Sequence, residues 1–173
     1  MKGALVTGGA IRVGRALALA LAADGYFVFV HHHSSTVEAR RTVADIVAAG
    51  GRARALKADL SSARQAEALV GRCQAPALAP RVRVAGIAPG LTLRSGSQTD
   101  ARFAEQHTQN PLGVGVTVDD LVRAMRFILQ TPTFTGDTLI VDSGEHLTGR
   151  PRDIAFDRKV GAAGRTAPAR KKA

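Results

Sequence analysis

The feature that most constrains this chain is a glycine-rich turn at residues 7–14, which separates a short apolar strand at residues 3–6 from an apolar helix at about residues 13–23. Small residues at such a turn let the backbone approach a pyrophosphate, and the start of the helix offers free N–H groups and a favourable dipole. An ordinary tight turn without a ligand is the alternative at this point. Because the turn lies between a strand and a helix, the sequence favours dinucleotide binding.

Strands and helices alternate along the first half of the chain. Further apolar strands are predicted at residues 26–30 and 52–57, with helices at residues 36–49 and 61–74. Unbroken apolar strands with short connections are typical of a parallel sheet that helices cover on both faces. The sequence therefore predicts an α/β fold with a Rossmann-like doubly wound parallel sheet.

The second half of the chain is less regular. A proline-punctuated stretch at residues 75–80 precedes an apolar strand at residues 82–88. A long loop then leads to a helix at residues 118–130, which Thr117 caps, and to a last strand at residues 139–141. We expect the strand at 82–88 to pair with the first strand, because the apolar edge of the first strand would otherwise stay unpaired. The sheet would then be reduced in strand number.

Basic charge is concentrated at the end of the chain. The net charge is +10, and residues 150–173 hold eight basic side chains against two acidic ones. This tail is rich in alanine, glycine and proline, and Phe156 is its one aromatic residue, so it lacks the side chains that stack on bases. We expect one domain at residues 1–149 and a disordered tail for which nucleic acid is not the expected partner.

The cellular setting follows from what the sequence lacks. No apolar run approaches the roughly 18 residues of a membrane span, and the first residues lack the layout of a secretory signal peptide. One cysteine, Cys73, cannot form a disulfide within the chain. We therefore expect a cytoplasmic protein that is not a membrane partner.

The glycine turn and the segment after the second strand resemble a known family. Residues 7–14 resemble the Thr-Gly-x-x-x-Gly-x-Gly loop of short-chain dehydrogenases, with Arg12 in place of the middle glycine. Together with the His/Ser-rich residues 31–35 and with Glu38 and Ala39, this loop is similar to the pteridine reductase branch and its dihydrofolate- and dihydromonapterin-reducing relatives. The resemblance covers two blocks, residues 1–74 and 81–149, and implies NADP(H)-dependent reduction of a pteridine or carbonyl substrate.

The resemblance also implies which residues contact the cofactor. In that branch the loop arginine and the His/Ser segment surround the adenosine 2′-phosphate, the acid after the third strand binds adenine, and a Pro-Gly turn holds the nicotinamide end. Asp59 could instead be an acid at the start of a helix, because Ser61 and Ser62 follow it. The expected cofactor-binding residues are Gly8, Ile11, Arg12, Val13, Gly14, His32, His33, Ser34, Ser35, Asp59, Leu60, Pro89, Gly90 and Thr92.

Two arguments from the residues themselves bear on this site. An NAD site places a carboxylate after the second strand to bind the ribose hydroxyls, and this chain has none there, so NADP(H) is favoured. The three adjacent histidines at residues 31–33 do not predict a metal site, because neighbouring residues of an extended segment point to opposite faces.

The catalytic residues of the family are missing. Its chemistry needs a serine and a Tyr-x-x-x-Lys pair, but Tyr26 is the single tyrosine and Val30 stands four residues later. Tyr26 is expected to pack in the core. The two blocks meet between about residues 73 and 80, where at least about 60 family residues are skipped, so we expect an internal deletion. His107 and His146 appear isolated in the sequence, and no catalytic residue is assigned.

Three functions therefore stay open. The first is a reductase that is impaired or inactive, the second is a non-catalytic dinucleotide-binding remnant, and the third is an interaction module that uses the basic tail. A homo-oligomer also stays open, although the helix interface that relatives use for it is missing.

Overall fold

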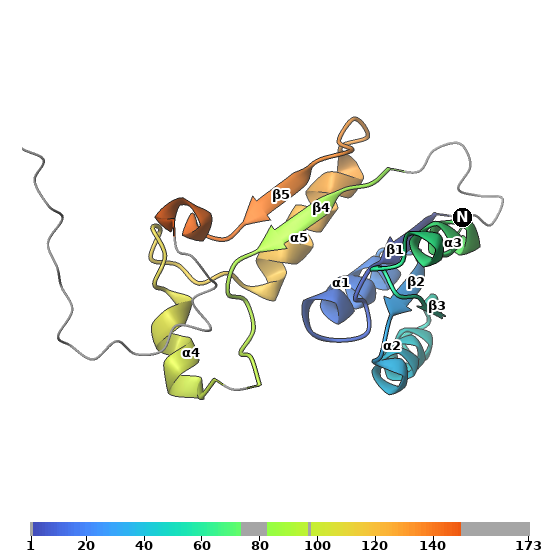
Figure 1. Ribbon diagram of the computed structural model, residues 1–173, viewed down its shortest axis with the longest axis horizontal. Helices are drawn as coiled ribbons and strands as arrows, with labels where there is room; N and C mark the ends of the chain where they lie inside the picture. Colours follow the sequence, from blue (N-terminus) through green and yellow to red (C-terminus); the bar gives the residue numbers. More distant parts are fainter. Residues whose placement is uncertain (1, 74–82, 97, 150–173) are drawn as a thin grey trace, which may run out of the picture.

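The computed structural model describes residues 2–73, 83–96 and 98–149, and the predicted tail lies outside these ranges. The first half forms a three-stranded parallel sheet in the order β1-β2-β3 (Figure 1). Its strands are β1 (Gly3–Val6), β2 (Phe27–His32) and β3 (Arg52–Lys57). The predicted parallel sheet is confirmed for these three strands.

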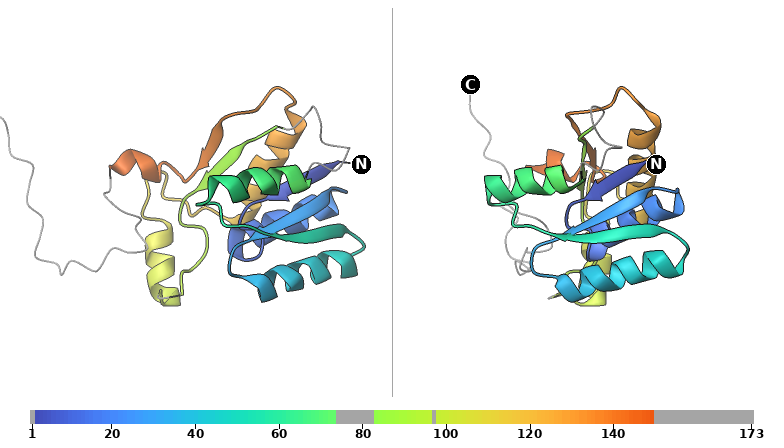
Figure 2. Two further views of the ribbon diagram at one scale, coloured as in Figure 1. Left: turned by 45° about the vertical axis from the view of Figure 1, so that its right-hand side comes forward. Right: turned by 90° about the vertical axis from the view of Figure 1, so that its right-hand side faces the viewer.

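Helices cover both faces of this sheet, as predicted. They are α1 (Arg12–Ala23), α2 (Thr36–Ala48) and α3 (Ala63–Cys73), and Figure 2 shows α3 on the opposite side of the sheet from α1. Alternate residues of β2 point to the two faces. Val28 and Val30 pack with α1 and α2, whereas Phe29 packs with Leu69 of α3.

Glycines end the first two helices. Gly25 and Gly50 take left-handed backbone conformations, with φ of 86° and 81°. At each end three backbone N–H groups donate back to carbonyls near the end of the helix, Gly25 to Ala22 and Gly50 to Val47 among them. This pattern satisfies carbonyls that the helix cannot pair itself, and glycine adopts it without a steric penalty.

The second half forms its own small sheet. β4 (Gly86–Pro89) and β5 (Thr138–Val141) pair in parallel, with α5 (Val118–Gln130) between them in the chain. α4 (Asp100–His107) lies in the connection, and a short 3-10 helix, η1 (Glu145–Thr148), follows β5 (Figure 1).

The prediction that the strand at 82–88 pairs with β1 is wrong. β4 pairs with β5, and within the described residues no strand occupies the second edge of β1. Arg83 explains part of the difference. Its guanidinium donates to the carbonyls of Ile128 and Thr131 at 2.8 Å each, which ties this residue to the end of α5. β4, α5 and β5 thus close into a local unit.

Helix α5 docks the second half on the first. Met125 is 6% exposed and belongs to the same core cluster as the buried side chains of α1. Arg126 adds two hydrogen bonds of 2.9 Å to the carboxylate of Asp24 at the end of α1. Because the two charged side chains are partly exposed, we attribute most of the docking free energy to the apolar contact.

The predicted cap of α5 is confirmed. The Thr117 hydroxyl accepts the backbone N–H of Asp120, and the Asp120 carboxylate accepts the backbone N–H of Thr117 at 2.8 Å. This reciprocal arrangement satisfies two N–H groups at the start of the helix. Within the part of the chain that the structure describes, no helix is long and apolar enough to span a membrane.

The docking contact can be tested with Met125→Ala. Truncating this buried side chain should lower the free energy of unfolding by about 2–5 kcal/mol, measured by urea unfolding. Phe127→Ala on the same helix is the control, because Phe127 is 51% exposed and its truncation should cost less. An equal decrease in the free energy of unfolding for the two variants would contradict the docking of α5 on α1.

The cap of α5 predicts a pH dependence. Hydrogen bonds from the Thr117 hydroxyl and backbone, followed by Arg123, lower the pKa of Asp120 from 3.8 to about 2. A carboxylate with a lowered pKa stabilises the folded state above its ordinary pKa and loses this contribution as the pH falls through the folded value. The difference in free energy of unfolding between the wild type and Asp120→Asn should be constant above about pH 5 and shrink between about pH 4 and pH 2. A difference that does not change with pH would argue against the capping carboxylate.

Candidate functional site

The first block places its predicted cofactor residues at one edge of the sheet, where β1, β2 and β3 end (Figure 1). Ligands of open parallel sheets bind outside this carboxyl edge. The end of β2, the three connections that leave this edge and the first turn of α1 together carry Gly8, Ile11, Arg12, Val13, Gly14, His32, His33, Ser34, Ser35, Asp59 and Leu60.

The glycine turn packs tightly against the start of α1. A Cβ on Gly14 would overlap the carbonyl group of Gly8, so only glycine lets the helix begin this close to the turn. Ile11 precedes the helix without a side-chain cap, and the first turn of α1 carries no acidic residue. The first N–H groups of α1 are therefore left for an anionic ligand, which the helix dipole favours.

Two buried polar side chains hold the turn in place. Thr42 of α2 is fully buried, and its hydroxyl donates to the carbonyl of Ala10 at 3.0 Å. His31 of β2 accepts the N–H of Gly8 at Nδ1, at 3.2 Å, and its Nε2 lies 3.1 Å from the carbonyl of Ala58.

His31 was missed by the sequence analysis, which assigned the neighbouring residues 32–35 instead. The signal that could have found it is a polar residue inside an otherwise apolar strand, on the face opposite Val30. A buried polar side chain needs hydrogen-bond partners, and the end of a strand beside the glycine turn supplies them.

His32 is buried to the same degree as His31 but has a free ring atom. It is 6% exposed, and its Nδ1 has no hydrogen-bond partner. Burial lowers the pKa of His32, and the nearby positive charges of Lys57 and Arg40 lower it further. A neutral imidazole with an unsatisfied buried nitrogen is a group that a ligand at this edge can satisfy.

Asp59 serves the start of α3 in this structure. Its carboxylate accepts the N–H and the hydroxyl of Ser61 at 2.9 and 2.7 Å, and His33 Nδ1 lies 3.5 Å away. These hydrogen bonds from Ser61 lower the pKa of Asp59, so the carboxylate is charged at neutral pH. Leu60 beside it is 45% exposed. The role of these two residues toward adenine stays a prediction.

Arg12 joins the glycine turn to the second block. Its backbone takes a left-handed φ of 51°, and its guanidinium donates to the carbonyls of Leu93 at 3.0 Å and Arg94 at 2.8 Å. The side chain thus points to the loop after β4, and its part in binding a 2′-phosphate stays a prediction.

The predicted second-block residues lie at the end of β4, where Pro89 is the last residue, and in the loop that follows it. The N–H of Gly90 donates to the carbonyl of Val141 at 3.0 Å, which continues the pairing of β4 with β5 beyond Pro89. Thr92 is 7% exposed, and its hydroxyl donates to the carbonyl of Gly90 at 2.9 Å. Through Arg12, the expected nicotinamide-side residues are connected to the expected phosphate-side residues.

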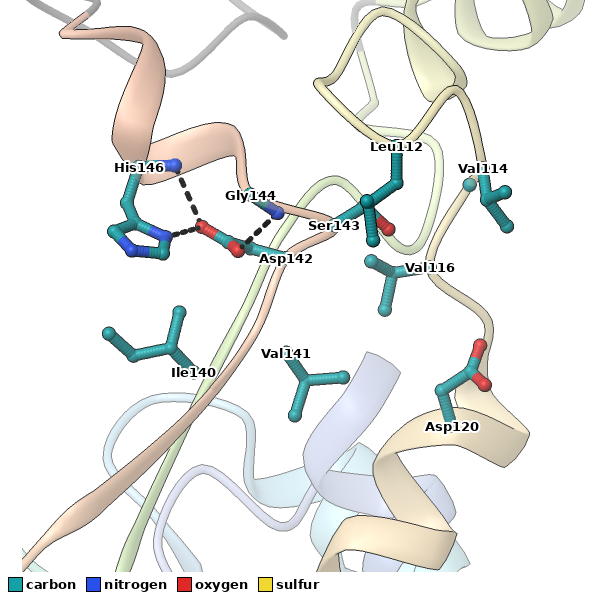
Figure 3. A pocket seen from close by; sticks show the side chains of 11 residues that line it. Leu112, Val114, Val116, Asp120, Ile140, Val141, Asp142, Ser143, Gly144 and His146 are labelled. Atoms are coloured by element: carbon teal, nitrogen blue, oxygen red, sulfur yellow. Dashed lines mark hydrogen bonds and ion pairs between the residues drawn. The ribbon is translucent and has the colours of Figure 1, made fainter.

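A separate hollow of about 470 Å³ opens beside β5 (Figure 3). Its walls are mainly apolar, and Asp142 and His146 add a polar side. Burial would raise the pKa of the Asp142 carboxyl, but hydrogen bonds from His146 and Gly144 together outweigh it and lower that pKa. The apolar lining consists of Leu112, Val114, Val116, Ile140 and Val141.

The two histidines that looked isolated in the sequence both have partners. His146 Nδ1 lies 2.7 Å from the Asp142 carboxylate, four residues earlier in the chain. His107 Nε2 lies 2.9 Å from the carbonyl of Val116, and its ring stacks on Phe103. His107, at the end of α4, is thereby connected to the segment before α5, and His146, in η1, to the residue that follows β5. Among the described residues, no group of three or more His, Cys, Asp or Glu side chains is placed to hold a metal ion.

Comparison with known proteins gives matches of different extent. The family model described as short chain dehydrogenase matches residues 2–125. An uncharacterised oxidoreductase of Methylorubrum extorquens is 49% identical over 69 residues, which are 40% of this chain and 28% of that relative. A 3-oxoacyl-(acyl-carrier-protein) reductase of Synechocystis is 43% identical over 67 residues, which are 39% of this chain and 27% of that relative. The chain spans less than a third of the length of these two curated relatives.

A solved structure extends the similarity to the whole fold. The FolM alternative dihydrofolate reductase 1 from Brucella canis, complexed with NADP, is similar with a TM-score of 0.71 at 22% identity. The match covers 88% of this chain and 97% of that chain. It supports the Rossmann-like α/β fold, and at this identity it carries no argument about activity.

The close approach of α1 to the glycine turn can be tested with Gly14→Ala. The added methyl group meets backbone that cannot move aside, so the free energy of unfolding should fall by about 1–3 kcal/mol. Gly96→Ala is the control, because a Cβ there meets no atom within 4 Å. Thermal unfolding of the two variants checks this expectation, and an unchanged melting temperature for Gly14→Ala would contradict the geometry of the turn.

Proposed function

This chain belongs to the short-chain dehydrogenase family, and on that premise we propose that it is an NADP(H)-binding domain of this oxidoreductase family that has lost reductase turnover. The observation that carries the proposal is the start of α1. It lies against the glycine turn, has no side-chain cap and has no acidic residue in its first turn. These are the properties that a pyrophosphate requires of a helix start.

The residues after β2 favour NADP(H) over NAD(H). His32, His33, Ser34 and Ser35 stand where an NAD site needs a carboxylate, and the nearest acid along the chain, Glu38, is exposed within α2. Ser35 precedes α2 without capping it, so the start of α2 also keeps free N–H groups for a phosphate. The positive charges of Lys57 and Arg40 lie near His32 and add to this preference.

We assign the substrate class of the ancestral reaction to pteridines or small carbonyl compounds. The Arg12 loop and the His/Ser segment resemble the pteridine reductase branch, and the similar Brucella protein is described as an alternative dihydrofolate reductase. Bound NADPH would supply a hydride to such a substrate. The chain's own residues would hold the cofactor through the glycine turn, the end of β2 and the loop after β4.

Loss of turnover follows from the missing proton donor. Tyr26 is the single tyrosine of the chain, and it packs against the core cluster that α1, α2 and β2 share. Its ring also lies beneath the ammonium group of Lys2, at 5.9 Å. A tyrosine that packs against the core at the start of β2 cannot donate a proton to a substrate at the other end of the sheet. An internal deletion between the two blocks accounts for the missing serine, tyrosine and lysine.

The proposal is tested by fluorescence titration with NADPH and NADH. We expect saturable binding that is tighter for NADPH, and no oxidation of NADPH above the buffer rate with a dihydropterin or a diketone. Ser34→Asp should weaken NADPH binding at least about tenfold, because its carboxylate repels the 2′-phosphate, and should affect NADH less. Ser34 is exposed, so the variant should fold, and Ser34→Asn is the uncharged control. Equal affinity for both cofactors would overturn the NADP(H) preference, and measurable turnover would overturn the loss of catalysis.

A further inference from the structure

His31 occupies the point where the three strands of the first sheet end. It is 4% exposed, although it lies one residue before the end of β2. Its Nδ1 faces the N–H of Gly8 in the glycine turn at 3.2 Å. Its Nε2 faces the carbonyl of Ala58, just after β3, at 3.1 Å. One imidazole ring therefore connects the ends of β1, β2 and β3.

The two partners determine the protonation state of this ring. A backbone N–H can only donate, and a backbone carbonyl can only accept. The pair of contacts therefore requires a neutral imidazole with its proton on Nε2 and a lone pair on Nδ1. A protonated ring has two donors and no acceptor, so its Nδ1–H would face the N–H of Gly8.

Gly8 is the residue through which this contact reaches the phosphate-binding turn. Its φ is 64°, and its N–H is held by His31 while the carbonyl of Ala10, two residues later, is held by Thr42. On the basis of the proposed function, we propose that neutral His31 is a positioning residue that fixes the glycine turn for the dinucleotide. Protonation of its ring then releases the turn and weakens binding of the dinucleotide.

Among the described residues, no acidic side chain forms an ion pair with His31. The titratable residues next along the chain are His32 at the end of β2 and His33 after it, with Lys57 at the end of β3 and Asp59 two residues later. Asp59 is bound to Ser61 and faces His33, and Arg12 on the glycine turn is bound to the loop after β4. The face that α3 covers contributes Leu69 to this region, whereas Arg64 and Glu67 of α3 are exposed.

The pH dependence distinguishes His31 from its neighbours by sign. A protonated His32 or His33 beside a phosphate would strengthen binding as the pH falls, by charge attraction. A protonated His31 weakens binding, because it loses the acceptor for Gly8. A loss of affinity at acidic pH therefore has the sign expected for His31 and the opposite of the sign expected for His32 and His33.

Two substitutions separate the two hydrogen bonds of the ring. His31→Asn places a carbonyl oxygen near the position of Nδ1 and keeps the acceptor for Gly8 without a titrating group. His31→Gln reaches the position of Nε2, keeps a donor for Ala58 and loses the acceptor. Each variant keeps one bond, so similar melting temperatures are expected, and the pair controls for folding.

The first measurement is NADP⁺ binding to the wild type and both variants at about pH 8 and about pH 5.5. Between pH 8 and pH 5.5 we expect the NADP⁺ affinity of the wild type to fall about tenfold more than the affinity of His31→Asn. We expect His31→Gln to bind NADP⁺ about tenfold more weakly than His31→Asn at both pH values. Identical pH profiles for the wild type and His31→Asn, or wild-type affinity in His31→Gln, would overturn the proposal.

A second measurement needs no nucleotide. Nitrogen NMR shifts of the His31 ring should show the Nε2–H tautomer at pH 8, and the Gly8 amide should exchange with solvent faster in His31→Gln than in the wild type. A ring protonated on Nδ1, or equal exchange in the two proteins, would overturn the role of His31. Absence of NADP⁺ binding by every protein at pH 8 would instead overturn the proposed function, and the exchange rates would still decide the role of His31.

Discussion

The contact between α1 and α5 is the interaction on which the rest of this structure depends. No described strand joins the three-stranded sheet to the two-stranded sheet, so the halves are not connected by a continuous hydrogen-bond ladder. Met125 and its neighbours on α5 close the same apolar core that α1, α2 and β2 build. Only because this contact holds does the loop after β4 lie within reach of Arg12. A packing interface far from the carboxyl edge therefore determines whether the candidate site is whole.

The candidate site divides into a part that is built locally and a part that is not. The residues expected on the phosphate side all come from the first block, where short connections, Thr42 and His31 hold them. The residues expected on the nicotinamide side belong to the docked second block. Under the proposed function, loss of a catalytic segment between the two blocks would therefore remove proton transfer and leave the phosphate side of the site in place.

Local patterns allowed much of the fold to be predicted from the sequence. Apolar runs and glycines marked β1, β2, β3 and the helices between them, and Thr117 marked the start of α5. The pairing of β4 could not be predicted, because it depends on Arg83 reaching carbonyls about 45 residues further along the chain. The expectation for Arg12 rested on family resemblance, whereas its observed partners lie 81 and 82 residues away.

His31 shows the same limit within the site itself. Strand alternation tells which face the ring occupies, but not that Gly8 and Ala58 present one donor and one acceptor to it. Those partners are 23 and 27 residues away, in the turn after β1 and just after β3. Short-range pattern thus determines which residues gather at the edge of the sheet, and long-range contacts determine what each of them does there.

One edge of β1 has no partner strand among the residues that the structure describes, and such an edge bears on association with other chains. Apolar strand edges recruit other chains, and longer edges recruit them more effectively. β1 and β4 are each four residues long, so only alternate residues, about two per strand, direct their backbone groups outward. An incoming strand would gain few hydrogen bonds and would lose its conformational freedom in return. The brevity of these strands thus limits the number of hydrogen bonds that their edges can offer to another chain.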